Sequence, residues 1–280
     1  MDRRLFVNRL ALAAAGLSLA NTNARAAGRR KLSRIGAQLY TVRRELGKDF
    51  EGTLAKVAAL GYREVEFAGY FGRRPAEVKA LLRRLGLDAP AAHVSLAELR
   101  GDLRPLLDAA QAVGHRYLLV AWLPPEERAS LDHYRRLADL FNEAGARMFR
   151  EGVQFAYHNH DFEFAPSGGR VPYDLLLERT DPRAVKLEMD LYWAVKGGAN
   201  PVEYFGRHPG RFRLLHVKDM DATPRRSFAD VGRGVIDFKS VFARSGGAGA
   251  RHYFVENDEP AGSPFESLRV SFDYLRRLEF

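Results

Sequence analysis

Residues 153–164, V-Q-F-A-Y-H-N-H-D-F-E-F, place two histidines after a short apolar run and follow them at once with acids. Such a run is typical of a buried β-strand, in which residues two apart point to the same face of the sheet. We therefore expect His158 and His160 to project together from the carboxyl end of a strand, with Asn159 turned to the other side. Imidazoles in this position could bind a metal ion or move a proton.

Later apolar segments end in a similar way, on Asp190, on His216 with Lys218 two residues further, and on Glu256. Burying several ionisable groups together is costly unless a cation or hydrogen bonds compensate. Imidazole and carboxylate groups suit a divalent metal of borderline hardness such as Mn, Co or Zn, and Mg stays open. The sequence therefore predicts a metal site built from the ends of successive strands.

Apolar runs alternate with longer amphipathic stretches along the rest of the chain. Strands are expected at residues 35–41, 62–67, 87–95, 116–122, 153–160, 185–190, 212–218 and 251–256. Helices are expected at residues 50–60, 75–85, 103–113, 124–150, 173–179, 201–207, 238–244 and 264–278. Strict alternation predicts one domain over residues 32–280, an α/β fold of the closed (β/α)8 TIM barrel type, in which all strand ends meet at one mouth. A doubly wound sheet is the weaker alternative, because no Gly-x-Gly-x-x-Gly follows the first strand.

Further side chains fall at the predicted mouth and could bind substrate hydroxyls or stack on a sugar ring. Each has a plainer reading as a satisfied polar group or as packing, and for Lys218 the plainer reading is an ion pair with Glu256 or Asp190. The residues that we expect to contact substrate are Gln38, Tyr40, Glu66, His93, His160 and Trp193.

Composition narrows the class of protein. The chain has no cysteine, which excludes disulfides, thiolate metal sites and a lipoprotein anchor. Its formal charge of +9 comes partly from residues 1–26, which carry four arginines and one aspartate, and the remaining basic residues are scattered pairs on helices. We therefore expect solvated helix faces and no nucleic-acid partner.

The first 26 residues have the pattern of a targeting segment. Arg3 and Arg4 precede a short apolar stretch, and Ala24-Arg25-Ala26 is an A-x-A cleavage pattern. The arginine pair resembles a twin-arginine signal. The apolar stretch is too short to span a bilayer comfortably. We therefore predict an exported, periplasmic protein without a membrane anchor.

Several motifs together resemble the sugar phosphate isomerase/epimerase family of the xylose-isomerase-like barrels, and the resemblance covers about residue 32 to the carboxyl terminus. They are Gln38-Leu39-Tyr40-Thr41, the Tyr-His-Asn-His-Asp-Phe-Glu-Phe segment from Tyr157, Asp190 with Trp193, His216-Val217-Lys218-Asp219-Met220, and Val255-Glu256-Asn257-Asp258. The resemblance implies a divalent metal, often Mn, and a small-molecule sugar substrate. The implied ligands are His158, Asp190, His216 and Glu256, with His160 as the rival of the first.

One departure from the family pattern matters for the reaction. Ketose 3-epimerases of this superfamily use two glutamates as paired bases, and His158 stands at one of these positions here. We therefore expect an isomerase or epimerase that removes the proton alpha to a carbonyl, with Glu256, His158 and Lys218 as catalytic residues. Keto-sugar dehydratase or lyase chemistry at the same site is the alternative. Export favours a free or glycosidic sugar over a phosphorylated one.

Two other classes of protein are compatible with such a barrel. A repair nuclease of the endonuclease IV type is disfavoured, because Trp193 stands where those enzymes have a histidine and their Asp-x-His is replaced by Asp230-Val231-Gly232. A non-catalytic sugar-binding partner of an oxidoreductase stays open, as does assembly into a homo-oligomer.

Overall fold

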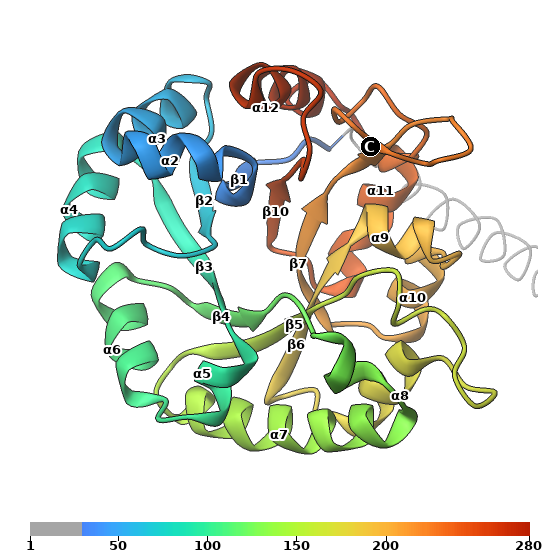
Figure 1. The fold of residues 1–280 in the computed structure, drawn as a ribbon. Coiled ribbons are helices and arrows are strands. Elements are labelled where there is room, and N and C mark those ends of the chain that lie inside the picture. Colours follow the sequence, from blue (N-terminus) through green and yellow to red (C-terminus); the bar gives the residue numbers. More distant parts are fainter. Residues whose placement is uncertain (1–29) are drawn as a thin grey trace, which may run out of the picture.

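The computed structural model describes residues 30–280, and the predicted targeting segment lies outside the described residues. The strands of the main sheet are β1 (Gly36–Gln38), β2 (Glu64–Phe67), β3 (Asp88–Val94), β4 (Tyr117–Val120), β5 (Gln154–His158), β6 (Val185–Asp190), β7 (Phe212–Val217) and β10 (His252–Val255). They pair in parallel and close into a barrel in the order β1-β10-β7-β6-β5-β4-β3-β2 (Figure 1). The predicted (β/α)8 TIM barrel is confirmed.

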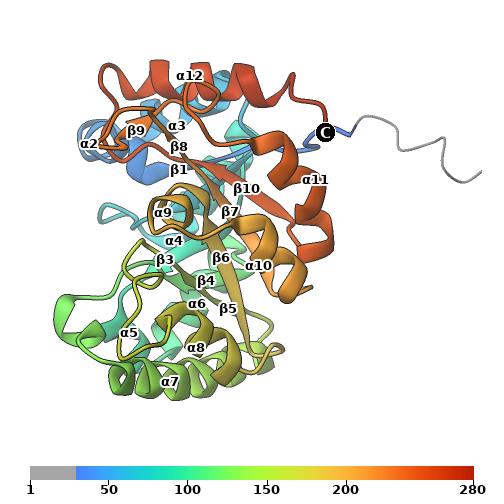
Figure 2. The same cartoon turned by 90° about the vertical axis from the view of Figure 1, so that its right-hand side faces the viewer.

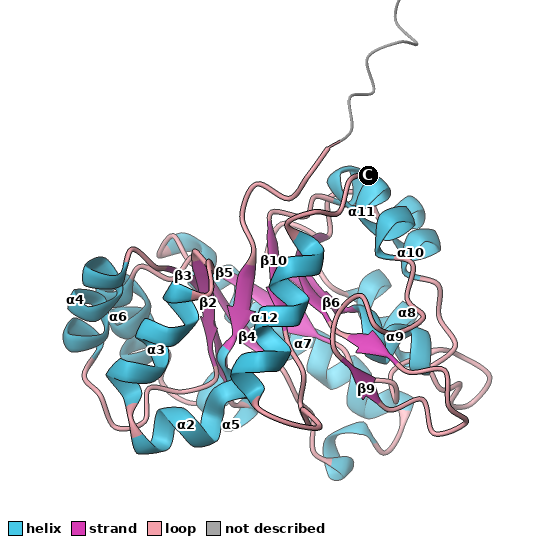
Figure 3. Ribbon diagram, turned by 90° about the horizontal axis from the view of Figure 1, so that it is seen from above, coloured by secondary structure: helices cyan, strands magenta, loops and turns pink. Residues whose placement is uncertain are grey.

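Helices connect the strands and surround the barrel, as the view from above shows (Figure 3). They are α2 (Arg43–Lys48), α3 (Phe50–Ala59), α4 (Pro75–Leu85), α5 (Leu96–Arg100), α6 (Arg104–Val113), α7 (Leu131–Arg150), α8 (Pro172–Arg179), α9 (Leu191–Lys196), α10 (Pro201–Arg207), α11 (Phe238–Ala248) and α12 (Pro264–Leu275). Helices α3 and α12 cover one side of the barrel, and α7 and α8 cover the opposite side (Figure 2). None of the helices within residues 30–280 is long and apolar enough to cross a bilayer.

A small apolar cluster fills the inside of the barrel and forms the floor of the mouth. Its fully buried members are Ala91, Leu119, Ala156, Leu214 and Phe254. Phe254 needs a glycine opposite it, because a Cβ at Gly36 would lie 2.4 Å from the Phe254 ring. Side chains two residues apart share a face of a strand, so the next inward layer is polar. That layer contains His93, His158, His216 and Glu256.

Short helices that the hydrophobic pattern did not predict lie at strand ends. The predicted first strand stops at Gln38, whose side chain caps the 3-10 helix η1 (Leu39–Val42). Asp190 caps α9 by accepting a hydrogen bond from the Trp193 amide at 2.9 Å. The predicted helix at residues 124–150 is divided at Ser130 into the 3-10 helix η2 (Pro125–Arg128) and α7. Helix α5 was also missed.

The connection from β7 to β10 contains a two-stranded hairpin, β8 (Asp219–Met220) with β9 (Phe228–Ala229). The buried Asp219 carboxylate holds this connection by accepting hydrogen bonds from the amides of Met220, Gly232, Gly234 and Ile236. Gly232 has φ +89, and a Cβ there would lie 2.3 Å from the Tyr274 ring. Asp219 therefore organises the loop that borders the mouth.

Candidate active site

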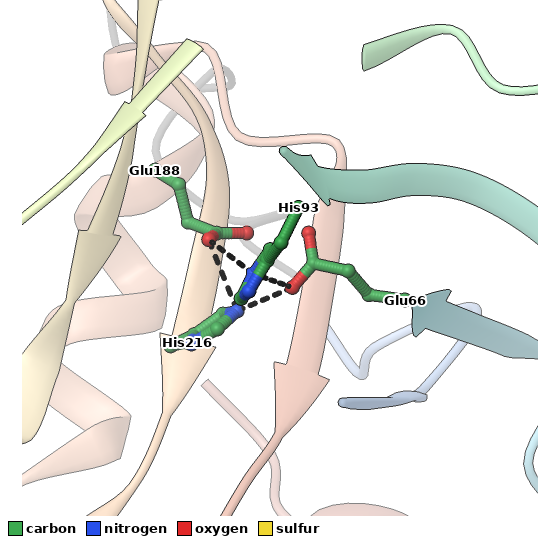
Figure 4. Close-up of side chains that lie close together, drawn as sticks. All are labelled: Glu66, His93, Glu188 and His216. Carbon is green, nitrogen blue, oxygen red and sulfur yellow. Dashed lines mark hydrogen bonds and ion pairs between the residues drawn. The ribbon is translucent and has the colours of Figure 1, made fainter. Parts of the chain in front are cut away.

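His216, near the end of β7, lies between two groups of acidic and imidazole side chains. In the first group it meets Glu66 from β2, His93 from β3 and Glu188 from β6 (Figure 4). His216 Nε2 lies 2.6 Å from Glu66 Oε2 and 3.0 Å from Glu188 Oε2, and His93 Nε2 lies 3.0 Å from Glu66 Oε2. The other oxygens of the two glutamates are buried without a hydrogen-bond partner. The imidazoles of His93 and His216 therefore offset the charge of the two carboxylates.

The second group lies at the other edge of the same imidazole. One ligand atom each from His158, Asp190 and His216 lies within 4.8 Å of the others. His158 Nε2 is 3.7 Å and His216 Nδ1 is 3.9 Å from Asp190 Oδ2, while Glu256 Oε2 is 3.0 Å from His216 Nδ1. The structure thus brings the four predicted metal ligands to one place. His160 is in neither group of the described residues.

The register of the barrel explains this convergence. His158 is paired with Glu188 across β5 and β6, and Asp190 is paired with His216 across β6 and β7. Asn159, which follows β5, clamps the end of β6. Its amide accepts from the Asp190 backbone N–H at 3.1 Å and donates to the Asp190 carbonyl at 3.3 Å. The histidine before Asn159 is thereby fixed next to Asp190.

The hydrogen bonds of His158 test whether these residues fit a metal ion. His158 Nδ1 lies 3.0 Å from Glu188 Oε2, and we assign the ring proton to this nitrogen. Burial, with the repulsion of His216, lowers the pKa of His158 well below its ordinary value, so the ring is neutral. The lone pair on Nε2 then faces the Asp190 carboxylate, and two groups with lone pairs repel each other. A cation between them would remove this repulsion, and the 3.7 Å between Nε2 and Oδ2 leaves room for two metal–ligand bonds of about 2.0–2.2 Å. His158, Asp190 and His216 therefore fit a divalent ion, with Glu188 orienting the imidazoles from behind.

Lys218 is buried among three carboxylates. Its Nζ lies 3.1 Å from Asp190 Oδ2, 2.7 Å from Glu256 Oε2 and 2.8 Å from Asp258 Oδ1. Burial disfavours the charge, but the attraction of these carboxylates outweighs it and holds the pKa of Lys218 well above its ordinary value. The ammonium is therefore a fixed positive charge at the mouth.

The carboxyl groups differ in protonation because their neighbours differ. Burial and the charge of Glu66 raise the pKa of Glu188 to about 7. Burial also acts on Glu256, but the attraction of Lys218 and His216 is greater and lowers its pKa to about 2. For Asp258 burial prevails, and its pKa rises to about 6. At neutral pH the site therefore offers an ionised carboxylate at Glu256 and a partly protonated one at Glu188.

His160 lies one step outside the metal-ligand groups, because β5 ends at His158. Its ring stacks on Phe162, with centroids 5.4 Å apart and planes at 8°, and its centroid is 5.1 Å from that of Trp193. Its Nδ1 is buried without a hydrogen-bond partner, and burial, with the repulsion of Lys218, lowers the pKa of His160 to about 3. His160 is therefore a neutral imidazole beside the mouth.

The other residues predicted to contact substrate have unequal positions. Gln38 is fully buried, and its Nε2 lies 2.6 Å from Glu66 Oε2 and 3.0 Å from His93 Nε2. Tyr40 is 41% exposed, with the Arg43 guanidinium 3.9 Å from its ring centroid. Gln38 thus contacts Glu66 and His93 of the first group from within the barrel, whereas Tyr40 is open to solvent.

Two acidic residues of the site were not predicted, and a third, Glu188, was expected on the same strand face as Asp190 but deeper in the barrel, as a weaker ligand. In the structure Glu188 lies behind the histidines, at a place that depends on the stagger of the barrel. Asp258 stands in the Val-Glu-Asn-Asp motif, two residues after Glu256. Glu163 is fully buried, accepts a hydrogen bond from the His160 amide at 2.7 Å and is also hydrogen-bonded to the Tyr157 hydroxyl. Burial, against these hydrogen bonds, raises the pKa of Glu163 to about 7.

Comparisons with known proteins agree with this architecture. The chain is 25% identical over 266 residues to an inosose dehydratase from Geobacillus kaustophilus, which covers 80% of this chain and 86% of that protein. A solved sugar phosphate isomerase/epimerase from Parabacteroides distasonis superimposes with a TM-score of 0.76 and 29% identity, over 88% of this chain and 98% of that one.

A more distant structure, an IOLI protein with a bound zinc atom, has a TM-score of 0.67 and 14% identity over 86% of this chain and 95% of that one, and so shares the fold. A model of one family matches residues 54–278, nearly the whole barrel. The chain belongs to the family of xylose isomerase-like TIM barrels.

Proposed function

We propose that this protein is a divalent-metal-dependent enzyme that removes the proton alpha to the carbonyl of a keto-sugar. The observation that carries the proposal is the meeting of His158, Asp190 and His216 around a common point, next to Glu256 and Lys218. These three residues would hold the ion, and Glu256 lies beside them. When bound, the ion supplies Lewis-acid polarisation of a carbonyl and an adjacent hydroxyl. Mn is our first choice, and Co, Zn and Mg are alternatives.

The chain's own residues divide the proton transfer between them. Glu256 is our candidate for the base, because its lowered pKa keeps it ionised at neutral pH and it lies at the mouth. Lys218 is held as a cation 2.7 Å from Glu256 and can donate a hydrogen bond to the oxygen that becomes an enolate. His158 is occupied as a ligand. The neutral His160, with its unpartnered Nδ1, is placed to orient substrate beside Trp193.

Of the possible fates of the enediolate, we favour loss of a leaving group at the beta carbon, as in a dehydratase or lyase. Epimerisation needs a second base on the opposite face of the carbon, and His158 is tied to Glu188 at 3.0 Å instead. Elimination needs an acid for the leaving oxygen, and the Lys218 ammonium at the mouth could supply that proton. The similarity to an inosose dehydratase over most of both chains supports the same choice.

The second candidate is the isomerase or epimerase expected from the sequence. It is favoured by the structure from Parabacteroides distasonis, which bears that name at 29% identity. Both candidates share the removal of the alpha proton and differ in the product, so one experiment that identifies the product separates them. The substrate would be a free or glycosidic keto-sugar in preference to a phosphorylated one, in keeping with the predicted export.

The test is a screen of keto-sugars and 3-keto-glycosides with the Mn-loaded protein in D2O, followed by NMR. We expect hydrogen at the carbon beside the carbonyl to exchange and an unsaturated product to accumulate. Glu256→Gln should lower turnover by about 10²–10⁴-fold, as for loss of a general base. Glu266→Gln, a surface change on α12, is the control. Sugar binding without exchange in any substrate would instead identify a non-catalytic binding protein.

A further inference from the structure

A cavity of about 290 Å³ opens beside the mouth, between the loop after β4 and the loop after β5. Arg128 and Tyr134 line it from the first side, and Phe162 and Pro166 line it from the second. Small-molecule sites commonly combine such apolar walls with a few polar groups that fix orientation. The polar groups of this wall therefore indicate what the cavity binds.

Arg128 is a half-buried cation without an ion pair to any carboxylate of the described residues. Its guanidinium carbon lies 3.7 Å from the Phe162 ring centroid, and its Nε is buried without a hydrogen-bond partner. No carboxylate within residues 30–280 makes an ion pair with Arg128, and the neighbouring Glu127 pairs with Arg100 at 2.5 Å. Because burial of an unpaired charge is costly, an anion from outside the chain would stabilise it.

Tyr134 offers a second donor in the same cavity. The residue is 2% exposed and lines the cavity, and none of the side-chain hydrogen bonds within residues 30–280 involves its hydroxyl. Burial raises the pKa of Tyr134 above its ordinary value, so the hydroxyl keeps its proton and can donate.

The cavity communicates with the candidate active site through one aromatic ring. The Phe162 ring contacts the Arg128 guanidinium and also stacks on the His160 ring. His160 in turn lies 5.1 Å from Trp193 and 5.2 Å from His158, measured between ring centroids. A ligand of two linked units could therefore place one unit at the proposed metal site and the other in the neighbouring cavity.

We propose that this cavity is a subsite for a carboxylate-bearing substituent of the substrate, so that the enzyme acts on acidic keto-glycosides. The planar guanidinium presents parallel donors that match a carboxylate, and its stacking on Phe162 fixes it in place. The proline and aromatic walls accommodate the ring that carries the carboxylate. This inference rests on the proposed function, because it names the second unit of that substrate.

A phosphate fits the cavity less well than a carboxylate. Phosphate sites usually gather several cations or backbone amides at a helix N-terminus, because the ligand carries nearly two charges. Arg128 is the only Lys or Arg among the residues that line the cavity, and the Ser167 amide already donates to the Arg170 carbonyl at 2.9 Å. One arginine and one hydroxyl suit a monoanion.

The experiment compares two 3-keto-glucosides that differ only in a 4-carboxyphenyl or a phenyl aglycone, with the Mn-loaded protein. We expect kcat/KM for the carboxylate to exceed that for the neutral compound by roughly 10–100-fold, the usual range for a charge-assisted hydrogen bond. Arg128→Met should bring the ratio near one, chiefly through KM, and Arg128→Lys should keep a few-fold preference. Arg207→Met is the control, because Arg207 also stacks on an aromatic ring, with its guanidinium carbon 4.3 Å from the Tyr204 centroid, and does not line the cavity.

A binding measurement separates this inference from the proposed function. The thermal shift caused by plain 4-carboxyphenyl and phenyl glucosides needs no turnover, and the same Arg128-dependent preference for the carboxylate would support the subsite even if no keto-sugar reacts. Equal effects of both ligands on the wild-type protein would overturn it. So would a preference that survives in a folded Arg128→Met protein, or a stronger Arg128-dependent preference for a 4-phosphonophenyl ligand.

Discussion

Replacement of Lys218 by methionine tests the electrostatic account of the site. The ammonium lies within 3.1 Å of carboxylate oxygens of Asp190, Glu256 and Asp258, and only 3% of its side chain is exposed. Methionine fills most of the same volume but leaves the three carboxylates facing one another. Removing one partner of a buried ion pair costs about 3–5 kcal/mol, because the remaining charge is uncompensated.

The expected loss is measurable by thermal unfolding in EDTA. For a domain of this size each kcal/mol lowers Tm by about 2–4 °C, so Lys218→Met should lower it by roughly 6–20 °C. Lys79→Met is the matched control, since the Lys79 ammonium donates to the Val113 carbonyl at 2.8 Å and has no carboxylate partner within residues 30–280. Losing this single hydrogen bond from a charged donor should cost about 1.5–3 kcal/mol.

Added Mn should then distinguish the variant in a second way. The ammonium and a divalent ion both interact with Asp190 and Glu256, so removing Lys218 removes a repulsion from the metal site. Binding to the folded state raises stability in proportion to the logarithm of metal concentration over Kd. The Mn-induced rise in Tm should therefore be larger for Lys218→Met than for the wild-type protein. If Lys218→Met loses no more stability in EDTA than Lys79→Met, or gains no more from Mn, the proposed charge balance is wrong.

Three further predictions concern a buried glutamate, two glycines and the histidines at the end of β5. A folded-state pKa of about 7 at Glu163 means that its protonated form stabilises the fold below about pH 4.5, and this stability, about 3 kcal/mol, is lost as pH rises toward 7. Urea unfolding of Glu163→Gln, which cannot ionise, should show a flatter pH dependence over that range. Gly232→Ala should lower Tm, because Gly232 has a positive φ and the new Cβ would meet the Tyr274 ring. Gly206→Ala in α10 places its Cβ with no atom within 4 Å, so it should raise the free energy of unfolding by up to about 1 kcal/mol and raise Tm accordingly. In calorimetric titration with Mn, His158→Gln should weaken binding at least tenfold and His160→Gln should not, and the reverse order would move the metal site.

Hydrophobic periodicity was sufficient to predict the barrel, because each strand packs its outward residues against helices. Residues 185–190 and 201–207 were predicted with the bounds that β6 and α10 have in the structure. The errors fall where a polar side chain caps a short helix at the strand end. The Gln38 side-chain oxygen Oε1 accepts a hydrogen bond from the Tyr40 amide, so the chain turns at a position that the apolar pattern would continue as strand.

The candidate site was predicted by residue type, whereas the contacts between side chains of different strands were not. Alternation along a strand puts Glu188 and Asp190 on the same inward face, and only the stagger between strands decides which carboxylate lies beside His158. Glu66 was expected to contact substrate, yet it lies under His216 at 2.6 Å. Such contacts join positions 150 residues apart, so local pattern carries no information about them.

The placement of His216 between the two groups suggests why so many acids can be buried in one barrel. Its pKa is raised well above the ordinary value because Glu188, Glu66 and Glu256 attract the charged form more than burial opposes it. An ion bound at Nδ1 would replace one proton of this imidazole, while Nε2 would still donate to Glu66 and Glu188. A divalent ion brings two positive charges and displaces one proton, so binding would change the net charge of the buried cluster by about one unit instead of two. At the proposed site the inner glutamates would act through the imidazoles, and their replacement should then weaken metal binding.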